Sequence, residues 1–82
     1  MVALVLTRSG FDDMRPRIDP ARDAIWLSAD VLSAAEVAEL RRSGINLTVF
    51  THGLDPANLD SDIGTVVEHH PGHVLWVETV AG

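Results

Sequence analysis

The chain has 82 residues, of which 46% are hydrophobic, so we expect one small folded domain over residues 1–82. It contains no cysteine, which excludes disulfides, thiolate catalysis and cysteine-based zinc or iron–sulfur sites. The formal charge of −6 argues against binding to a nucleic-acid backbone, which requires clustered cations.

The charged residues divide the sequence into two unlike halves. All six cations are arginines: Arg8, Arg15, Arg17, Arg22, Arg41 and Arg42. The part of the chain after Arg42 contains all four histidines and five of the carboxylates. Aspartates interleave with the first four arginines, which again disfavours a nucleic-acid surface. A solvated acidic surface is one interpretation of the second half, and a cation site is the other.

The first part of the chain predicts two strands separated by irregular structure. Residues 2–6 are apolar throughout, as in the central strand of a sheet, and residues 8–16 predict a loop. Residues 19–23 predict a turn between two extended pieces, one at residues 17–18 and the other a strand over 24–28. The first apolar run is too short to span a bilayer and has no basic region before it. We therefore expect a cytoplasmic protein without a membrane segment.

The clearest predicted element is a helix over residues 34–43. Ser33 and Glu36 have the spacing of a capping box, in which each side chain accepts a hydrogen bond from the backbone N–H of the other. Gly44 and Ile45 match a Schellman ending, in which the glycine adopts the left-handed conformation.

Three further elements complete the chain. Residues 45–51 predict a strand whose odd-numbered residues share one face. Residues 59–70 have apolar side chains at helical spacing, with Asp60 or Ser61 as the expected N-cap. Residues 74–80 predict the last strand.

This order of elements, β-(β)-β-α-β-α-β, predicts an α/β fold of two layers, with a small mixed or mostly parallel sheet and two helices. An α+β fold is the alternative. Two helices would leave one face of the sheet uncovered, and that face is where we expect an oligomer to form.

Polar side chains collect where the predicted parallel strands end. They are Ser28, Asp30, Thr51 and His52, joined by Arg8, Asp12 and Asp13 if the first strand runs the same way. As a catalytic set, Arg8 would hold an anion, His52 would transfer a proton, and Asp30 or Asp12 would orient the imidazole. The structural alternative makes Asp30 a loop cap and His52 an ordinary strand-end residue.

Three histidines and a carboxylate lie within six residues: Glu68, His69, His70 and His73. Imidazole and carboxylate groups are common zinc ligands, so a divalent metal such as zinc is the cofactor that this segment suggests. The predicted helix ends at Pro71, so His69 and His73 do not share a helical face. The alternative is a turn with partly exposed histidines, in which His70 packs on the apolar stripe. In a parallel sheet, His52 would lie at the opposite edge and could not join this cluster.

Two tryptophans within the predicted strands are the candidate interface residues. Trp26 and Trp76 each differ in parity from their leucine neighbours, so either both faces of the sheet are buried or one tryptophan lies on an uncovered face. An exposed tryptophan, together with Val74 and Val80, would indicate a surface for a partner.

No phosphate-binding glycine loop and no Gly-x-Ser-x-Gly motif is present, so we predict no cofactor-binding residues beyond the metal candidates. The preferred interpretation is a small cytoplasmic binding or interaction module that self-associates, with a protein or a second copy as its partner and no nucleic acid or membrane. The alternative is a small metal- or anion-dependent enzyme, or an enzyme subunit, that uses one of the two histidine-containing clusters.

Overall fold

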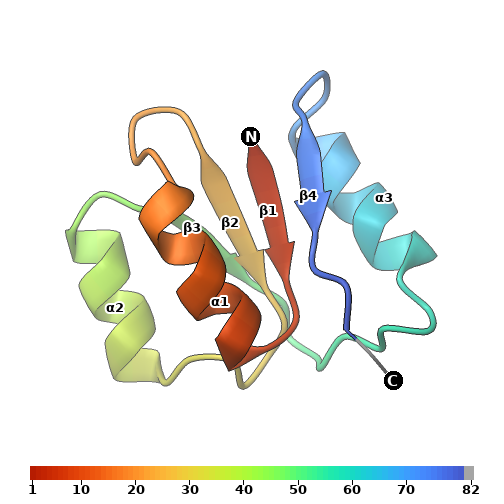
Figure 1. The fold of residues 1–82 in the computed structure, drawn as a ribbon, viewed down its shortest axis with the longest axis horizontal. Helices are drawn as coiled ribbons and strands as arrows, with labels where there is room; N and C mark the ends of the chain where they lie inside the picture. Colours follow the sequence, from red (N-terminus) through yellow and green to blue (C-terminus); the bar gives the residue numbers. More distant parts are fainter. Residues whose placement is uncertain (81–82) are drawn as a thin grey trace.

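A computed structural model describes residues 1–80 (Figure 1). The elements in chain order are β1 (Val2–Val5), α1 (Arg8–Met14), the 3-10 helix η1 (Arg15–Arg17), β2 (Ala24–Leu27), α2 (Ala34–Arg42), β3 (Asn46–Val49), α3 (Asp60–His69) and β4 (Leu75–Val77). Across these residues, no helix has the length and apolar character needed to cross a membrane.

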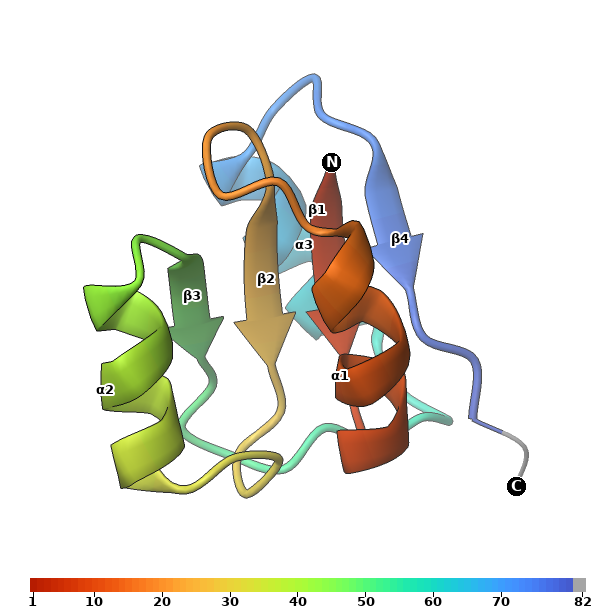
Figure 2. The same cartoon turned by 60° about the vertical axis from the view of Figure 1, so that its left-hand side comes forward.

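The four strands form one sheet in the order β3-β2-β1-β4, and all three pairings are parallel. Figure 2 shows α1 and α2 in front of the sheet and α3 behind it. The chain adds β2 and β3 in one direction and then returns to the far side of β1. Because crossovers share one hand, this reversal places α3 on the opposite face from α1 and α2. The predicted α/β class with a mostly parallel sheet is confirmed.

Helix α1 occupies a segment where the sequence predicted a loop. The Thr7 hydroxyl accepts a hydrogen bond from the Gly10 backbone N–H and so caps the helix. Phe11 and Met14 lie three residues apart, share one face and are buried against the sheet. Burial of this face stabilises a helix that its seven residues would not form in isolation.

Of the two extended pieces expected on either side of the turn at residues 19–23, the second is confirmed as β2, and the first, at residues 17–18, does not form a strand. Residues 15–17 form η1, and Asp19 and Asp23 then close a compact turn. The Asp23 backbone N–H donates to the Asp19 carbonyl at 2.8 Å, and the Asp19 N–H donates to the Asp23 carboxylate at 2.8 Å. These hydrogen bonds within the segment satisfy its backbone without a neighbouring strand.

The core consists of two clusters, one on each face of the sheet. The cluster under α1 and α2 contains the buried residues Ala3, Val5, Phe11, Met14, Ile18, Ile25, Leu27, Ile45 and Leu47. The cluster under α3 contains Val2, Leu4, Ala24, Trp26 and Val66. All four residues of β1 are buried, as predicted for a central strand. Both faces of the sheet are therefore covered, and the uncovered face expected from two helices does not exist.

Helix α2 has the ends that the sequence predicts. Both hydrogen bonds of the Ser33–Glu36 capping box are present. At the other end Gly44 has a φ of +90°, its N–H donates to Arg41, and the Ile45 N–H donates to Leu40, which is the Schellman pattern. For α3, the expected cap was wrong. Its N-cap residue is Leu59, with no side-chain hydrogen bond, and Asp60 already lies in the first turn.

The two predicted caps provide a stability test. Ser33→Ala removes the hydroxyl that accepts the Glu36 N–H, so we expect it to lower the free energy of unfolding by about 1 kcal/mol. Ser61→Ala removes a hydroxyl without a capping role, so its effect should stay within about 0.5 kcal/mol. Urea unfolding followed by circular dichroism measures both. Equal losses would contradict the assignment of Ser33 as the cap.

Candidate functional site

The carboxyl ends of the four strands meet at one edge of the sheet, and the helices change face between β1 and β4. Ligands of open parallel sheets bind beyond this edge, in the crevice formed at such a change of face. The loop after β1 and the segment after β4 border this position. It is therefore the first place where the fold itself predicts a binding site.

The carboxylate of Glu78, just after β4, fills this position. Its Oε1 accepts hydrogen bonds from the backbone N–H groups of Leu6 at 2.7 Å and Thr7 at 2.9 Å. The Thr7 hydroxyl donates to Oε2. Hydrogen bonds to a charged carboxylate are stronger than neutral ones. The chain therefore places an anion of its own at the point where an anionic ligand would be expected.

Gly10 in α1 makes room for this carboxylate. A Cβ atom at position 10 would lie 2.2 Å from the carboxyl carbon of Glu78. No side chain larger than that of glycine therefore fits while Glu78 stays bound. Thr7, Gly10 and Glu78 form one unit, which joins the end of the sheet to the start of the first helix.

Sequence reasoning missed this unit. A signal was present, because Glu78 is a charged residue inside the apolar run of 74–80 and has the same parity as Trp76. A carboxylate at an inward position needs hydrogen-bond donors. The donors belong to a loop 71 residues away in the sequence, and only the pairing of β4 with β1 identifies them.

The parallel strands bring the predicted catalytic residues to the carboxyl edge, but within residues 1–80 no side-chain hydrogen bond or ion pair joins Arg8, Asp30 and His52 to one another, and Asp12 pairs with Arg8 and not with the imidazole. Arg8 contacts Glu36 at 2.6 Å and Asp12 at 3.3 Å. His52 Nε2 lies 3.0 Å from a carboxylate oxygen of Asp62 on α3. Asp30 is exposed and has a φ of +68°. The three candidates thus have separate partners.

The predicted metal ligands lie at the opposite ends of the strands, with Glu68 and His69 in the last turn of α3 and His70 and His73 after it. His70 Nε2 accepts a hydrogen bond from the Trp26 indole N–H at 3.0 Å, and His69 Nδ1 lies 2.8 Å from the Thr65 carbonyl oxygen. The His70 and His73 rings meet edge to face, 5.9 Å apart. Over residues 1–80, no three His, Asp or Glu side chains are grouped so that they could hold a metal ion. The structure therefore does not assemble Glu68 and the three histidines into one ligand set.

His70 belongs to an aromatic cluster on the α3 face. Trp26 contacts Phe50 and the rings of His69 and His70, with centroid distances of 5.4, 5.3 and 5.9 Å. Burial lowers the pKa of His70 below its ordinary 6.5, and the nearby His73 and His69 lower it further. A neutral His70 keeps the lone pair that accepts the Trp26 N–H.

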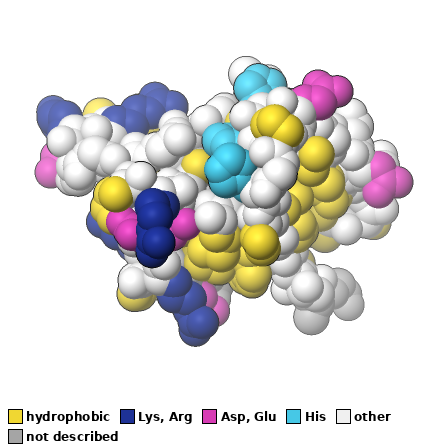
Figure 3. Space-filling model, turned by 90° about the horizontal axis from the view of Figure 1, so that it is seen from above, with side chains coloured by type: hydrophobic (Ala, Val, Ile, Leu, Met, Phe, Trp, Pro, Cys, Tyr) yellow, Lys and Arg dark blue, Asp and Glu magenta, His cyan; other side chains and the backbone are white. Residues whose placement is uncertain are grey.

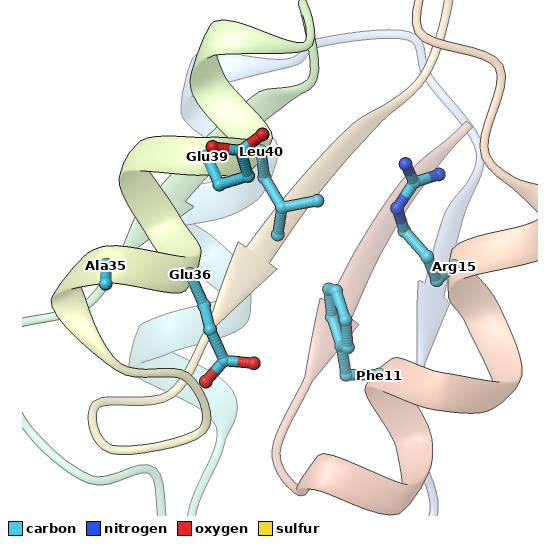
Figure 4. A pocket seen from close by; sticks show the side chains of 6 residues that line it. All are labelled: Phe11, Arg15, Ala35, Glu36, Glu39 and Leu40. Carbon is cyan, nitrogen blue, oxygen red and sulfur yellow. The ribbon is translucent and has the colours of Figure 1, made fainter.

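A groove of about 380 Å³ separates α1 from α2 (Figure 4). Phe11 and Leu40 line it with apolar surface, and Arg15 and Glu36 lie on opposite sides. The backbone N–H of Ser33, followed by the Arg8 guanidinium, lowers the pKa of Glu36, which therefore stays charged at neutral pH. The groove therefore presents apolar surface with a charged group on each side.

The two outer strands of the sheet, β3 and β4, differ in how many of their outward backbone groups are occupied. At β3, the Arg41 side chain donates from Nε and Nη2 to the outward carbonyl of Leu47, at 3.2 and 3.0 Å. At β4, the backbone groups that bond β1 belong to even-numbered residues, since the Val74 carbonyl accepts from Val2 and the Glu78 N–H donates to Leu4. The N–H and C=O groups of Leu75 and Val77 consequently point outward. Within residues 1–80 no strand lies beyond β4.

The two candidate interface residues have different positions. Trp26 is 6% exposed and lies in the core under α3. Trp76 is partly buried on the α1 face of the edge strand β4, and the neighbouring Val74 is 75% exposed. Figure 3, which views the molecule from above Figure 1, shows hydrophobic side chains gathered beside the histidines, while the arginines lie toward the left. Of the two tryptophans, only Trp76 lies next to open surface.

Comparisons with protein-family models, with curated proteins and with solved structures find no match.

The unit of Thr7, Gly10 and Glu78 can be tested by mutation. Glu78→Ala leaves two backbone N–H groups without their acceptor, so we expect it to lower the free energy of unfolding by about 1–3 kcal/mol. Gly10→Ala should be comparably destabilising, because the new Cβ displaces the same carboxylate. In the Glu78→Ala background the same glycine substitution should be neutral or stabilising, because alanine favours a helix by up to about 1 kcal/mol.

Urea unfolding of the two single variants and the double variant measures this coupling. Glu68→Ala is the control, since Glu68 is exposed, and its effect should stay within about 0.5 kcal/mol. Additive losses in the double variant would show that Gly10 and Glu78 act independently.

The lowered pKa of His70 predicts a pH dependence of stability. At pH values between 6.5 and the lower pKa of His70 in the folded chain, the unfolded chain binds one more proton at this residue than the folded chain does. The contribution of His70 is therefore fully present above about pH 6.5 and is lost as the pH falls through the folded pKa. We expect His70→Gln to flatten this slope between about pH 7 and 5, and His69→Gln to retain most of it, because His69 is the smallest of the three causes that lower the pKa of His70. Urea unfolding at several pH values is the measurement, and an unchanged slope in His70→Gln would refute this origin.

Proposed function

We propose that the chain is a small interaction module that self-associates along the outer edge of β4, with the cytoplasm as its expected compartment. The observation that carries this proposal is the difference between the two sheet edges. Arg41 occupies an outward carbonyl of β3, whereas Leu75 and Val77 direct unpaired backbone groups away from β4. An open edge strand is a template for another strand.

The side chains around β4 support the same proposal. Val74 is 75% exposed, which is unusual for a large apolar residue, and Trp76 is partly buried beside it. The segment from Val74 to Val77 carries no charge. Two chains of net charge −6 would therefore meet along an uncharged strand. Tryptophan next to exposed aliphatic surface is typical of protein interfaces.

In contrast, the position at the carboxyl edge where a ligand would bind is already occupied by a side chain of the same protein. Glu78 occupies the hydrogen-bond donors of Leu6 and Thr7. Arg8 and His52, the two main candidates for chemistry at this edge, pair with Glu36 and Asp62. These contacts favour a binding role over the enzymatic alternative.

Sedimentation of the full chain from about 10 µM to 1 mM tests the proposal, since short strand edges give weak association. We expect the average mass to rise with concentration. Val77→Pro removes an outward N–H that β1 does not use, so this variant should fold and remain monomeric. Val49→Pro is the matched control, because Val49 occupies the equivalent outward position on β3, and it should associate like the wild type.

Near-UV circular dichroism establishes that both proline variants are folded. A wild-type chain that stays monomeric at 1 mM would overturn the proposal. Equal association of the two proline variants would also overturn it, because the β4 edge would then have no special role.

A further inference from the structure

We infer that two copies of the chain pair their β4 strands antiparallel about a two-fold axis, with Leu75 opposite Val77 of the second copy and the two Trp76 side chains facing each other across the axis. This inference rests on the proposed function and defines its geometry. It predicts one continuous sheet of eight strands in the order β3-β2-β1-β4-β4-β1-β2-β3.

The partner of this edge is a second copy because β4 is the more open of the two edges: Arg41 occupies the outward carbonyl of Leu47 on β3, whereas within residues 1–80 both backbone groups of Leu75 and of Val77 are unpaired. If β4 of one copy paired with β3 of the next, each copy would keep an open edge and the contact would not close at two copies. Arg41 occupies the Leu47 carbonyl and so disfavours that arrangement. Pairing of β4 with β4 uses the same surface twice and closes at two copies.

The direction of pairing follows from the symmetry of the hydrogen bonds. In an antiparallel pair, two opposing residues exchange both of their hydrogen bonds, so the arrangement is identical from either strand. In a parallel pair, a residue on one strand bonds two residues that flank its neighbour, which offsets the strands. A two-fold axis between identical strands therefore requires the antiparallel arrangement.

The register follows from which backbone groups are free. Leu75 and Val77 point outward, and Trp76 bonds β1, so hydrogen-bonded pairs must join odd-numbered residues. Placing Leu75 opposite Val77 of the second copy uses all four outward groups of each strand in four hydrogen bonds. A shift by one pair in either direction would instead use His73 or Thr79, both of which lie outside β4.

This register places the apolar side chains together. Trp76 faces its own copy in a non-hydrogen-bonded pair, where opposing Cα atoms are only about 4.5 Å apart and side chains are closest. Val74, which is 75% exposed, lies diagonally across from Trp76 of the second copy and becomes covered. The exposed Val74 and the partly buried Trp76 are thus covered by the same contact.

Disulfide trapping tests this register, because the natural chain contains no cysteine. Single cysteines are introduced as Val74→Cys, Leu75→Cys, Trp76→Cys and Val77→Cys, and the rate of disulfide-linked dimer formation is measured under mild oxidation. At position 76 the two Cα atoms lie within the range of about 4.4–6.8 Å that a disulfide needs, and at the other positions they lie farther apart. We expect cysteine 76 to link on the order of ten times faster than the others.

The four cysteine positions also control for random collision. Val74 is the most exposed of them, so collision without a defined interface would favour cysteine 74. Fastest linking at position 75 or 77 would overturn the register. Equal or absent linking at all four positions, with self-association intact in sedimentation, would overturn the β4 pairing but not the self-association. A monomeric wild type would overturn both.

Hydrogen exchange of the wild-type chain provides a measurement that needs no substitution. Exchange of the Leu75 and Val77 amides should slow as the concentration, and hence the dimer fraction, rises. The Val49 amide on the β3 edge is the internal control and should exchange at a constant rate. Concentration-independent exchange at Leu75 and Val77 in an associating sample would refute the inference, even if Trp76→Cys failed to fold.

Discussion

After β3 at one side of the sheet, the chain returns past β2 and β1 to form β4 on the far side of β1. This return makes β4 the neighbour of the buried central strand and leaves β4 at an edge. Because crossovers share one hand, the return also places α3 on the face opposite α1 and α2. An 82-residue chain thereby covers both faces of a four-stranded sheet with short helices.

Glu78 stabilises this return. Strand β4 has three residues, and a strand so short contributes few ladder hydrogen bonds. The carboxylate adds contacts with Leu6 and Thr7, and Gly10 provides the space for it. The chemistry that many parallel sheets use for an external anion thus supports the fold here. Because Glu78 occupies the carboxyl edge, we place the proposed function on an outer surface of the sheet instead.

The same topology makes the two sheet edges unequal. Strand β3 directly follows α2, so an arginine in the last turn of that helix reaches the outward carbonyl of Leu47. Strand β4 follows the turn after α3, and no arginine or lysine occurs after Arg42 to protect it. An open sheet face was expected from two helices. Because α2 and α3 lie on opposite faces of the sheet, both faces are covered. The open surface is an edge, where backbone groups in addition to side chains determine what binds.

Local signals in the sequence predicted most of the elements, and long-range pairing determined the site. Helix α2 and both of its ends were predicted by the Ser33–Glu36 box and Gly44, and the alternation of residues 45–51 predicted which side chains of β3 share one face, because each of these signals acts over a few residues. Helix α1 was missed, since its stability comes from burying Phe11 and Met14 against distant strands. The contacts of His52 with Asp62 and of His70 with Trp26 were missed as well, because each joins residues from different elements. From the sequence alone we could predict which polar residues lie near the two ends of the strands. Which of these residues contact one another was decided by the tertiary structure, because the strand order brings together residues that no local pattern relates.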